Sequence, residues 1–220
     1  RGWFAEMAAK GPSILWEYGT AYEFFVSLFV LHQTEGFGIR PSFAAGVRSR
    51  IPPPERKLLE EIYPILGLPF KWIHELPAPR DTISALWALK QIPPAERMIR
   101  LQRLDEFVPH PESDPKEMEK QKASREALLR IAGEGKWTSE DIDFFQKLIG
   151  KKHDWLKRDA LERAIDWWSK PAELGEGFLS AIQSYYQAFF EEEEKRIEPI
   201  LREGLAHAQR RASELSIDDL

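Results

Sequence analysis

The stretch that decides the fold is PAELGEGFLSAIQSYYQAFFEEEEKRIEPILREGLAHAQRRASEL, residues 171–215. In it, apolar residues recur three or four positions apart, which is the spacing of one face of an α-helix. This pattern predicts a long C-terminal helix against which the rest of the chain packs. The residues that carry it are Leu174, Phe178, Ile182, Tyr185, Phe189, Ile197 and Ile200, followed in phase by Gly204 and Ala208.

Two prolines mark this predicted helix. Pro171 suits its first turn, where a backbone N–H needs no partner within the helix. Pro199 lies inside it, cannot donate to the carbonyl of Lys195, and crowds that turn with its ring. Because the apolar pattern continues in phase beyond Pro199, we expect a kink there and not an end.

A run of four glutamates, residues 191–194, lies inside the same helix. Glu191 and Glu192 each precede a basic residue by four positions, an arrangement that stabilises an exposed helix face. At about 100° per residue, Glu193 falls in the middle of the apolar face. Such a carboxylate is expected to pair with an arginine from another helix or to contact a ligand or metal. The remaining alternative is that the real helix has a different phase.

The composition favours a soluble domain with a sizeable core. The chain has 220 residues, of which 43% are hydrophobic, including 8 Trp and 13 Phe. No apolar run approaches the length of a transmembrane helix, so we expect a cytoplasmic location and no membrane partner. The net charge is −5, with acids and bases intermixed, which argues against nucleic-acid binding by the chain as a whole.

The chain contains no cysteine and no asparagine. Without cysteine it has neither disulfides nor thiolate metal sites. The loss of two thermolabile residue types, together with 16 prolines, predicts a thermophilic source. The chain opens on Arg1 and closes on residues 218–220, and we expect both ends to be cuts in a longer polypeptide.

A second helix is predicted near the N-terminus, starting after Ser13 as its N-cap and ending near residue 32. It is apolar nearly all round, which is typical of a central, buried helix. Its polar residues are therefore informative. Glu23 and Ser27 are four positions apart and share a narrow strip with Gly19. This strip is expected either to form a hydrogen bond to another helix or to accept a ligand.

Shorter amphipathic patterns predict further helices, several of them opened by a proline or a capping residue. Asp81 is the predicted N-cap of one of them, and the Thr138–Asp141 pair resembles a capping box at the start of another. Residues 67–79 are expected to be irregular, and the proline-rich loop at residues 108–115 is our predicted subdomain boundary. With no confident strand, the sequence predicts an irregular all-α domain. The additional helices are expected near residues 41–49, 54–65, 82–89, 93–107, 116–132, 138–149 and 153–169.

No catalytic motif accompanies these helices, so we expect no enzymatic activity. The glycine pairs near residues 133–135 and 175–177 match neither a dinucleotide loop nor a P-loop. His207 follows Glu203 by four positions on the long helix, whereas di-metal carboxylate bundles use Glu-x-x-His twice. These two residues are the only weak metal candidates, and we predict neither a metal site nor a cofactor.

Aromatic doublets form the last candidate site. Tyr185 and Tyr186, like residues 167–168 and 189–190, could line an apolar ligand pocket. Adjacent residues on a helix point about 100° apart, so each doublet can equally pack on two neighbouring helices as ordinary core.

Two stretches together resemble a known family. They are residues 22–32 and residues 185–201, with residues 68–70 fitting the same layout between them. They resemble the large helical domain of unassigned function that precedes a winged helix in some ArsR-type bacterial transcription regulators. The resemblance implies a regulatory, effector-sensing or dimerisation domain, with a DNA-binding winged helix expected after Leu220 and absent here. It implies no metal site and identifies no ligand.

These observations lead to one hypothesis and two alternatives. We expect residues 1–220 to form a dimeric regulatory domain in which an unknown small-molecule effector biases the long helix. The predicted ligand-binding residues are Glu23, Ser27, Tyr185, Tyr186 and Glu193. The alternatives are a metal-assisted hydrolase in a helical bundle and an interaction scaffold without a small ligand. Metal analysis would identify the first, and a large exposed apolar patch would favour the second.

Overall fold

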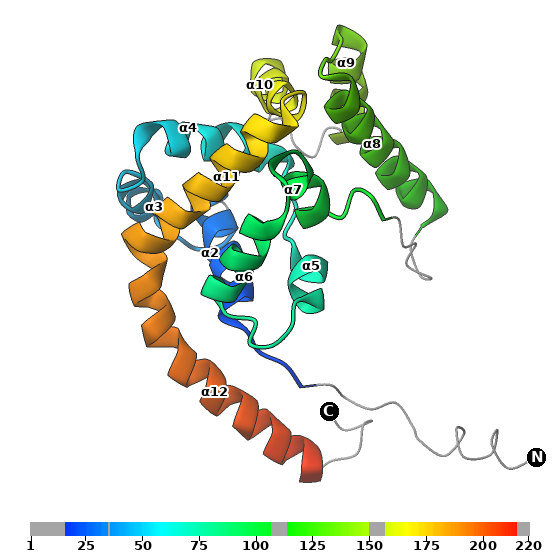
Figure 1. Cartoon of the computed structure of the whole chain (residues 1–220). Coiled ribbons are helices and arrows are strands. Elements are labelled where there is room, and N and C mark those ends of the chain that lie inside the picture. Colours follow the sequence, from blue (N-terminus) through cyan, green and yellow to red (C-terminus); the bar gives the residue numbers. More distant parts are fainter. Residues whose placement is uncertain (1–15, 35, 107–113, 150–156, 215–220) are drawn as a thin grey trace, which may run out of the picture.

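The computed structural model describes residues 16–34, 36–106, 114–149 and 157–214 (Figure 1). Within these ranges the regular elements are helical and no strand occurs, which confirms the predicted all-α class. The predicted boundary at residues 108–115 falls largely outside the described residues, as do residues 1–15. The helices are α2 (Thr20–His32), α3 (Pro41–Arg48), α4 (Pro53–Ile62), η1 (Tyr63–Ile65), α5 (Phe70–Glu75), α6 (Thr82–Gln91), α7 (Pro94–Leu101), α8 (Pro115–Glu134), α9 (Ser139–Ile149), α10 (Arg158–Trp168), α11 (Pro171–Tyr185), the π-helix η3 (Tyr186–Phe190) and α12 (Glu191–Glu214).

The long C-terminal helix is present, and α11 is its packed half. α11 packs most extensively against α7 and also against α4, and its apolar face is buried. The approach to α7 is close: a Cβ atom added at Gly175 would lie 2.0 Å from the carbonyl oxygen of Pro94. Gly175 is therefore explained by backbone contact, although its low helix propensity alone would predict a weak first turn.

A π-helical segment, η3, joins α11 to α12 without a break in the chain of helical turns. It shifts the buried face by one residue: after Tyr185, the next fully buried side chain is Phe190 and not Phe189. Phe189 is half-buried, and Ile200, which the regular pattern places on the apolar face, is 64% exposed. Figure 1 shows the ribbon changing direction where α11 meets α12.

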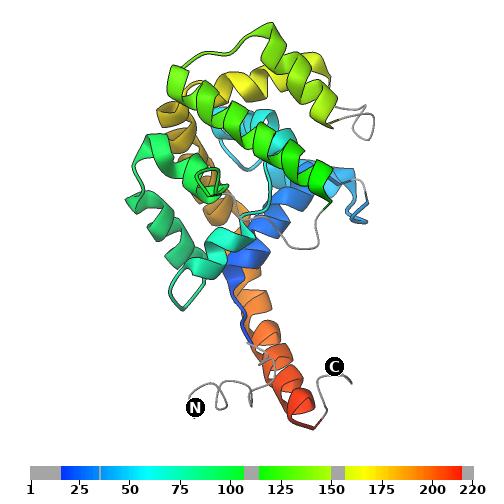
Figure 2. The same cartoon turned by 90° about the vertical axis from the view of Figure 1, so that its right-hand side faces the viewer.

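Most of α12 extends away from the other helices, as both views show (Figures 1 and 2). The helix does not end at Pro199, as expected, whereas the kink expected there stays a prediction. Its side chains at residues 200–213 are exposed or half-buried. α12 is thus an outlying extension of a helix whose first half is core.

The N-terminal helix starts later than expected. α2 begins at Thr20, with Gly19 and not Ser13 at its N-cap. Gly19 is extended, and residues 16–19 belong to no helix. A Cβ atom at Gly19 would lie 2.4 Å from the carbonyl oxygen of Arg80, and that same oxygen accepts a hydrogen bond from the N–H of Ala21 at 3.1 Å. A tertiary contact with the loop before α6 therefore fixes where the helix starts.

Two predicted helix caps are confirmed. The carboxylate of Asp81 accepts a 2.7 Å hydrogen bond from the N–H of Ser84 at the start of α6. Before α9, the carboxylate of Asp141 accepts a 2.8 Å hydrogen bond from the N–H of Thr138. The stretch expected to be irregular, residues 67–79, instead contains the short helix α5.

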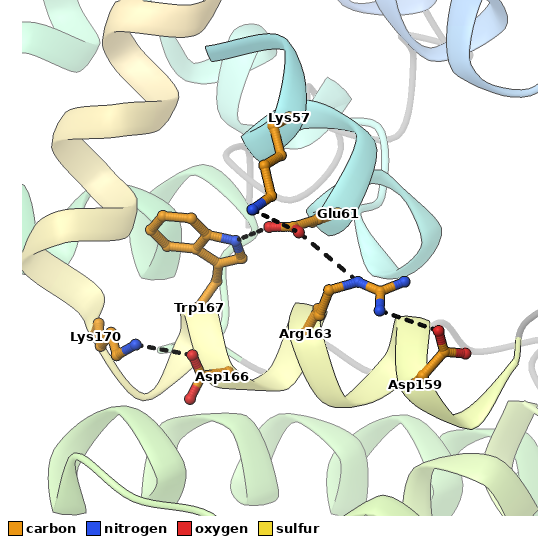
Figure 3. Close-up of polar contacts among 7 residues, drawn as sticks. All are labelled: Lys57, Glu61, Asp159, Arg163, Asp166, Trp167 and Lys170. Atoms are coloured by element: carbon orange, nitrogen blue, oxygen red, sulfur yellow. Dashed lines mark hydrogen bonds and ion pairs between the residues drawn. The ribbon is translucent and has the colours of Figure 1, made fainter. Parts of the chain in front are cut away.

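A cluster of charged residues connects α4 with α10 (Figure 3). Glu61 on α4 accepts a hydrogen bond from the indole N–H of Trp167 at 2.8 Å, and its carboxylate lies 3.7 Å from the Nε of Arg163. The carboxylate of Asp166 accepts hydrogen bonds from Lys170 at 2.8 Å and from the indole of Trp137 at 3.2 Å. Each charge faces an opposite charge or a donor, so this region is structural in character.

Candidate functional site

The carboxylate of Glu194 holds the junction between the packed helices and α12. It accepts hydrogen bonds from the hydroxyl of Thr20, from the backbone N–H of Thr82 at 3.2 Å, and from the hydroxyl of Tyr186 at 2.9 Å. These donors come from the first residue of α2, the first residue of α6 and the π-helical segment. One side chain of α12 thereby contacts three separate elements, which we call the Glu194 junction.

Electrostatics favour an ionised carboxylate at this junction. Burial by itself would raise the pKa of Glu194, but the hydrogen bonds from Thr20, Thr82 and Tyr186 outweigh it and lower this pKa below its usual value. Burial and the hydrogen bond to Glu194 raise the pKa of Tyr186, so its hydroxyl stays protonated and donates. Hydrogen bonds to an ionised carboxylate are stronger than hydrogen bonds between two neutral groups.

The sequence pattern assigns the inward position to the wrong glutamate. Glu193 is expected in the middle of the apolar face, but its side chain is 31% exposed and pairs with Arg196 of the same helix. The π-helical segment contains one residue more than the α-helical repeat allows, which rotates α12 by about 100°. Glu194 therefore takes the inward place, and the alternative of a different helical phase is correct.

Ser27 and Tyr185 form a partly buried hydrogen bond between α2 and α11. Their hydroxyl oxygens are 2.8 Å apart, and the Ser27 hydroxyl donates to the carbonyl of Phe24 at 2.9 Å. Because Ser27 has only one hydroxyl hydrogen, Tyr185 is the donor in this pair. Tyr185 is fully buried and its ring packs 5.4 Å from that of Phe24. This pair corresponds to the hydrogen-bond alternative for the Ser27 strip.

Glu23, the remaining predicted site residue, lines a groove of about 640 Å³ between α2 and α5. Its volume is within the usual range for small-molecule sites. The apolar floor is formed by Tyr22, Val26 and Phe70, and the Tyr22 and Phe70 rings have centroids 6.0 Å apart. We call it the α2–α5 groove. Its polar rim consists of Glu23, Lys71, His74, Glu75 and Arg103.

The rim contains both paired and unpaired charges. Glu75 forms an ion pair with Arg103, and Nδ1 of His74 lies 3.3 Å from the carboxylate of Glu17. Among the described residues, neither Glu23 nor Lys71 has a hydrogen bond or ion pair. As far as the described residues show, the groove therefore offers one unpaired carboxylate and one unpaired ammonium group above an aromatic floor.

The groove and the Glu194 junction are connected through α2. Tyr22 and Glu23 line the groove one turn or less from Thr20, which donates to Glu194. The hydroxyl of Tyr22 donates to Glu17 at 2.5 Å, and burial together with this bond raises the pKa of Tyr22 to about 12. A displacement of the first turn of α2 would therefore affect both places.

His32, at the other end of α2, is half-buried, and its surroundings favour the neutral form. Its ring stacks on Tyr63 with centroids 4.3 Å apart, and its Nδ1 is 2.9 Å from the carbonyl oxygen of Leu28. Burial lowers the pKa of His32 to about 4. Nδ1 must carry the hydrogen to bond a carbonyl, which leaves Nε2 as a buried acceptor without a partner in the described chain.

The predicted residues do not form one site. Glu23 lies on the groove, the half-buried Ser27 bonds to Tyr185 in the core, and Tyr186 belongs to the Glu194 junction. Neither tyrosine is among the residues that line the groove.

The metal candidates Glu203 and His207 are both exposed on α12. In the described part of the chain, no group of three histidine, aspartate or glutamate side chains lies close enough to hold a metal ion. Among the same residues, no helix is both long enough and apolar enough to cross a bilayer.

Sequence reasoning missed Thr20, Thr82, Glu194, Phe70 and Lys71. Thr20, Thr82 and Glu194 come together only because the π-helical segment rotates α12. No residue pattern in the sequence predicts that segment. Phe70 and Lys71 lie in a stretch expected to be irregular, where a helix of six residues gives too little periodicity to recognise.

Comparison with known proteins gives no relative: no family model, no curated protein and no solved structure matches this chain.

Proposed function

We propose that this chain is an effector-sensing regulatory domain in which a small molecule in the α2–α5 groove changes how α12 is held. The observation that carries this proposal is the Glu194 junction. Thr20, in the helical turn that borders the groove, is also a hydrogen-bond donor to the outlying helix. A ligand that shifts this turn would have different affinities for two conformations of the chain, which differ in the position of α12. Such a difference in affinity is required for any ligand-driven switch.

The resemblance to ArsR-type regulators connects the proposed switch with transcription. In that family a winged helix follows the long helix, so α12 would carry the movement to a DNA-binding segment C-terminal to Leu220. The domain would then act as a cytoplasmic homodimer, in which the setting of α12 determines the spacing of two DNA-binding units.

The test uses the natural gene product and genomic DNA. The DNA fragments that the protein retains are sequenced. The Kd for the most tightly bound fragment is then measured for the wild type, Glu194→Gln and Glu193→Gln. Glu194→Gln removes a charged acceptor at the junction, whereas Glu193→Gln removes only an exposed pair with Arg196. We expect the Kd of Glu194→Gln to change at least about fivefold, since coupling between two sites typically changes an affinity 5- to 150-fold. The Kd of Glu193→Gln should not change.

Two outcomes contradict the proposal in different ways. If no DNA fragment is retained, the connection with transcription is wrong. If DNA binds but both variants behave as wild type, Glu194 does not transmit a signal to the DNA-binding segment.

A second candidate function, protein interaction, is supported by an exposed apolar pair on α6. Ile83 and Trp87 are one turn apart and are 56% and 65% exposed. An interface would remove both of these apolar side chains from water. The expected occupant is a second copy of the chain, in line with the proposed dimer. Light scattering after size exclusion tests this: Trp87→Glu should convert a dimer to a monomer, and a monomeric wild type would exclude it.

A further inference from the structure

We infer that the α2–α5 groove binds a small zwitterion with an aromatic body, such as a free aromatic amino acid. This inference rests on the proposed function for its biological meaning, but it concerns the chemistry of the groove alone. It is drawn from the three features of the groove: its floor, its rim and its size.

The floor selects a flat apolar group. Tyr22 and Phe70 face the groove from two different helices, and Phe70 remains 42% exposed. An exposed phenyl ring beside a tyrosine is an incomplete aromatic cluster, because a third ring could stack on it or meet it edge-on. Val26 extends the apolar surface along α2.

The rim favours a ligand that carries one positive and one negative charge. Glu23 comes from α2 and Lys71 from α5, so the free charges lie on different helices of the groove. The other polar groups of the rim are already engaged: Arg103 pairs with Glu75 and with Glu106, and Nδ1 of His74 lies 3.3 Å from the carboxylate of Glu17. A ligand ammonium group would meet Glu23, and a ligand carboxylate would meet Lys71.

The size and openness of the groove fit a ligand that is small. A volume of about 640 Å³ accommodates one amino acid with a large side chain together with water. Because both free charges are exposed, each contributes little by itself, and the ligand must engage the floor and both charges to bind measurably. Loss of any one of these three contacts should therefore weaken binding measurably.

The experiment is calorimetric titration with four probes: L-phenylalanine, phenethylamine without the carboxylate, 3-phenylpropanoate without the amine, and L-alanine without the ring. We expect saturable binding of phenylalanine below about 10 mM, a range typical of weak small-ligand affinities. The other three probes should bind at least about tenfold more weakly, which corresponds to losing one favourable contact.

Two variants assign the charges. Glu23→Gln should weaken phenylalanine at least about fivefold and leave 3-phenylpropanoate unchanged, because only the amine contact is lost. Lys71→Gln should weaken phenylalanine and leave phenethylamine unchanged for the same reason. Glu60→Gln and Lys90→Gln, at exposed positions away from the groove, are the matched controls and should bind as wild type.

Absence of saturable phenylalanine binding to the wild type overturns the inference. Equal binding of phenylalanine and phenethylamine overturns the role of Lys71, and equal binding by Glu23→Gln overturns that of Glu23. None of these outcomes depends on DNA binding, so the groove can fail while the Glu194 test succeeds, and the reverse.

Discussion

The two halves of the C-terminal helix, α11 and α12, differ in almost everything except their continuity. α11 is buried among α4, α6, α7 and α10, and glycine is needed where it meets α7. α12 extends away from these helices and exposes Ile200. The π-helical segment separates them, and Glu194 is the first strong contact beyond it. One continuous helix therefore contains a core element and an attached arm, and the attachment is polar.

The largest expected difference between the halves comes from removing an apolar side chain in each. Phe178 on α11 is 2% exposed and Ile200 on α12 is 64% exposed. Phe178→Ala should lower the free energy of unfolding by about 3–5 kcal/mol, because it removes buried surface and leaves a cavity. Ile200→Ala should change it by less than about 0.5 kcal/mol. Urea unfolding followed by circular dichroism measures both, and similar losses would contradict the division of the helix.

Replacing two glycines of the C-terminal helix by alanine should change stability in opposite directions. A Cβ atom at Gly175 meets the backbone of Pro94, whereas nothing lies within 4 Å of one at Gly204. Gly175→Ala should destabilise the chain at or above the upper end of the roughly 1–3 kcal/mol typical of overpacking. Gly204→Ala should stabilise it by up to about 1 kcal/mol through helix propensity. Thermal unfolding of the two variants measures the sign directly, and stabilisation by both would show that α11 and α7 can move apart.

Mild acid should weaken the packed region and leave the arm unaffected. The pKa of His32 is lowered to about 4 in the folded chain, so the unfolded chain binds the proton more readily below about pH 6.5. Stability from neutral His32 is complete above that pH and falls by roughly 1.4 kcal/mol per unit as the pH drops toward 4.

Urea midpoints between pH 7 and 5 measure this loss. His32→Leu should flatten the pH dependence, whereas His207→Gln, at an exposed position on α12, should leave it unchanged. A wild-type profile that is already flat over this range would show that His32 titrates normally in the folded chain.

The last comparison is between the two neighbouring glutamates at the junction. Glu194→Gln should destabilise the chain by about 1–3 kcal/mol, since it replaces a charged acceptor of three hydrogen bonds. Glu193→Gln should change stability by less than about 0.5 kcal/mol, as expected for an exposed ion pair. Because the pKa of Glu194 is lowered, its contribution is complete above the usual carboxyl pKa and is lost as the pH falls through the lowered value.

The arm provides a second measurement of the same variants. The chain has no cysteine, so Lys90→Cys and Gln209→Cys introduce two spin labels at exposed positions without background. Loss of the junction in Glu194→Gln should broaden the distance distribution between α6 and α12. An unchanged distribution would show that η3 alone fixes the direction of α12.

Much of the fold could be predicted because helices depend on local information. The apolar spacing in residues 174–185, the N-cap at Asp81 and the capping box at Thr138 are each carried by a few neighbouring residues. The start of α2 could not be predicted, because Gly19 is placed by contact with Arg80, which is distant in sequence.

The candidate sites were predicted less well, for a related reason. Glu23 lies on a groove and Ser27 bonds to Tyr185, so the N-terminal strip was informative. Glu193 was assigned by extending a regular period across η3, where one extra residue invalidates it. The error is a single position, but on a helix this rotates a side chain by about 100°.

The sequence by itself determined the class of the fold, the long C-terminal helix and its continuation through Pro199, because periodicity and helix propensity act between neighbours. Only the tertiary structure decided which glutamate faces inward, where α2 begins, and that Glu23 and Lys71 border one groove. Each of these depends on residues far apart in the chain, whose contacts are set by packing and not by local spacing.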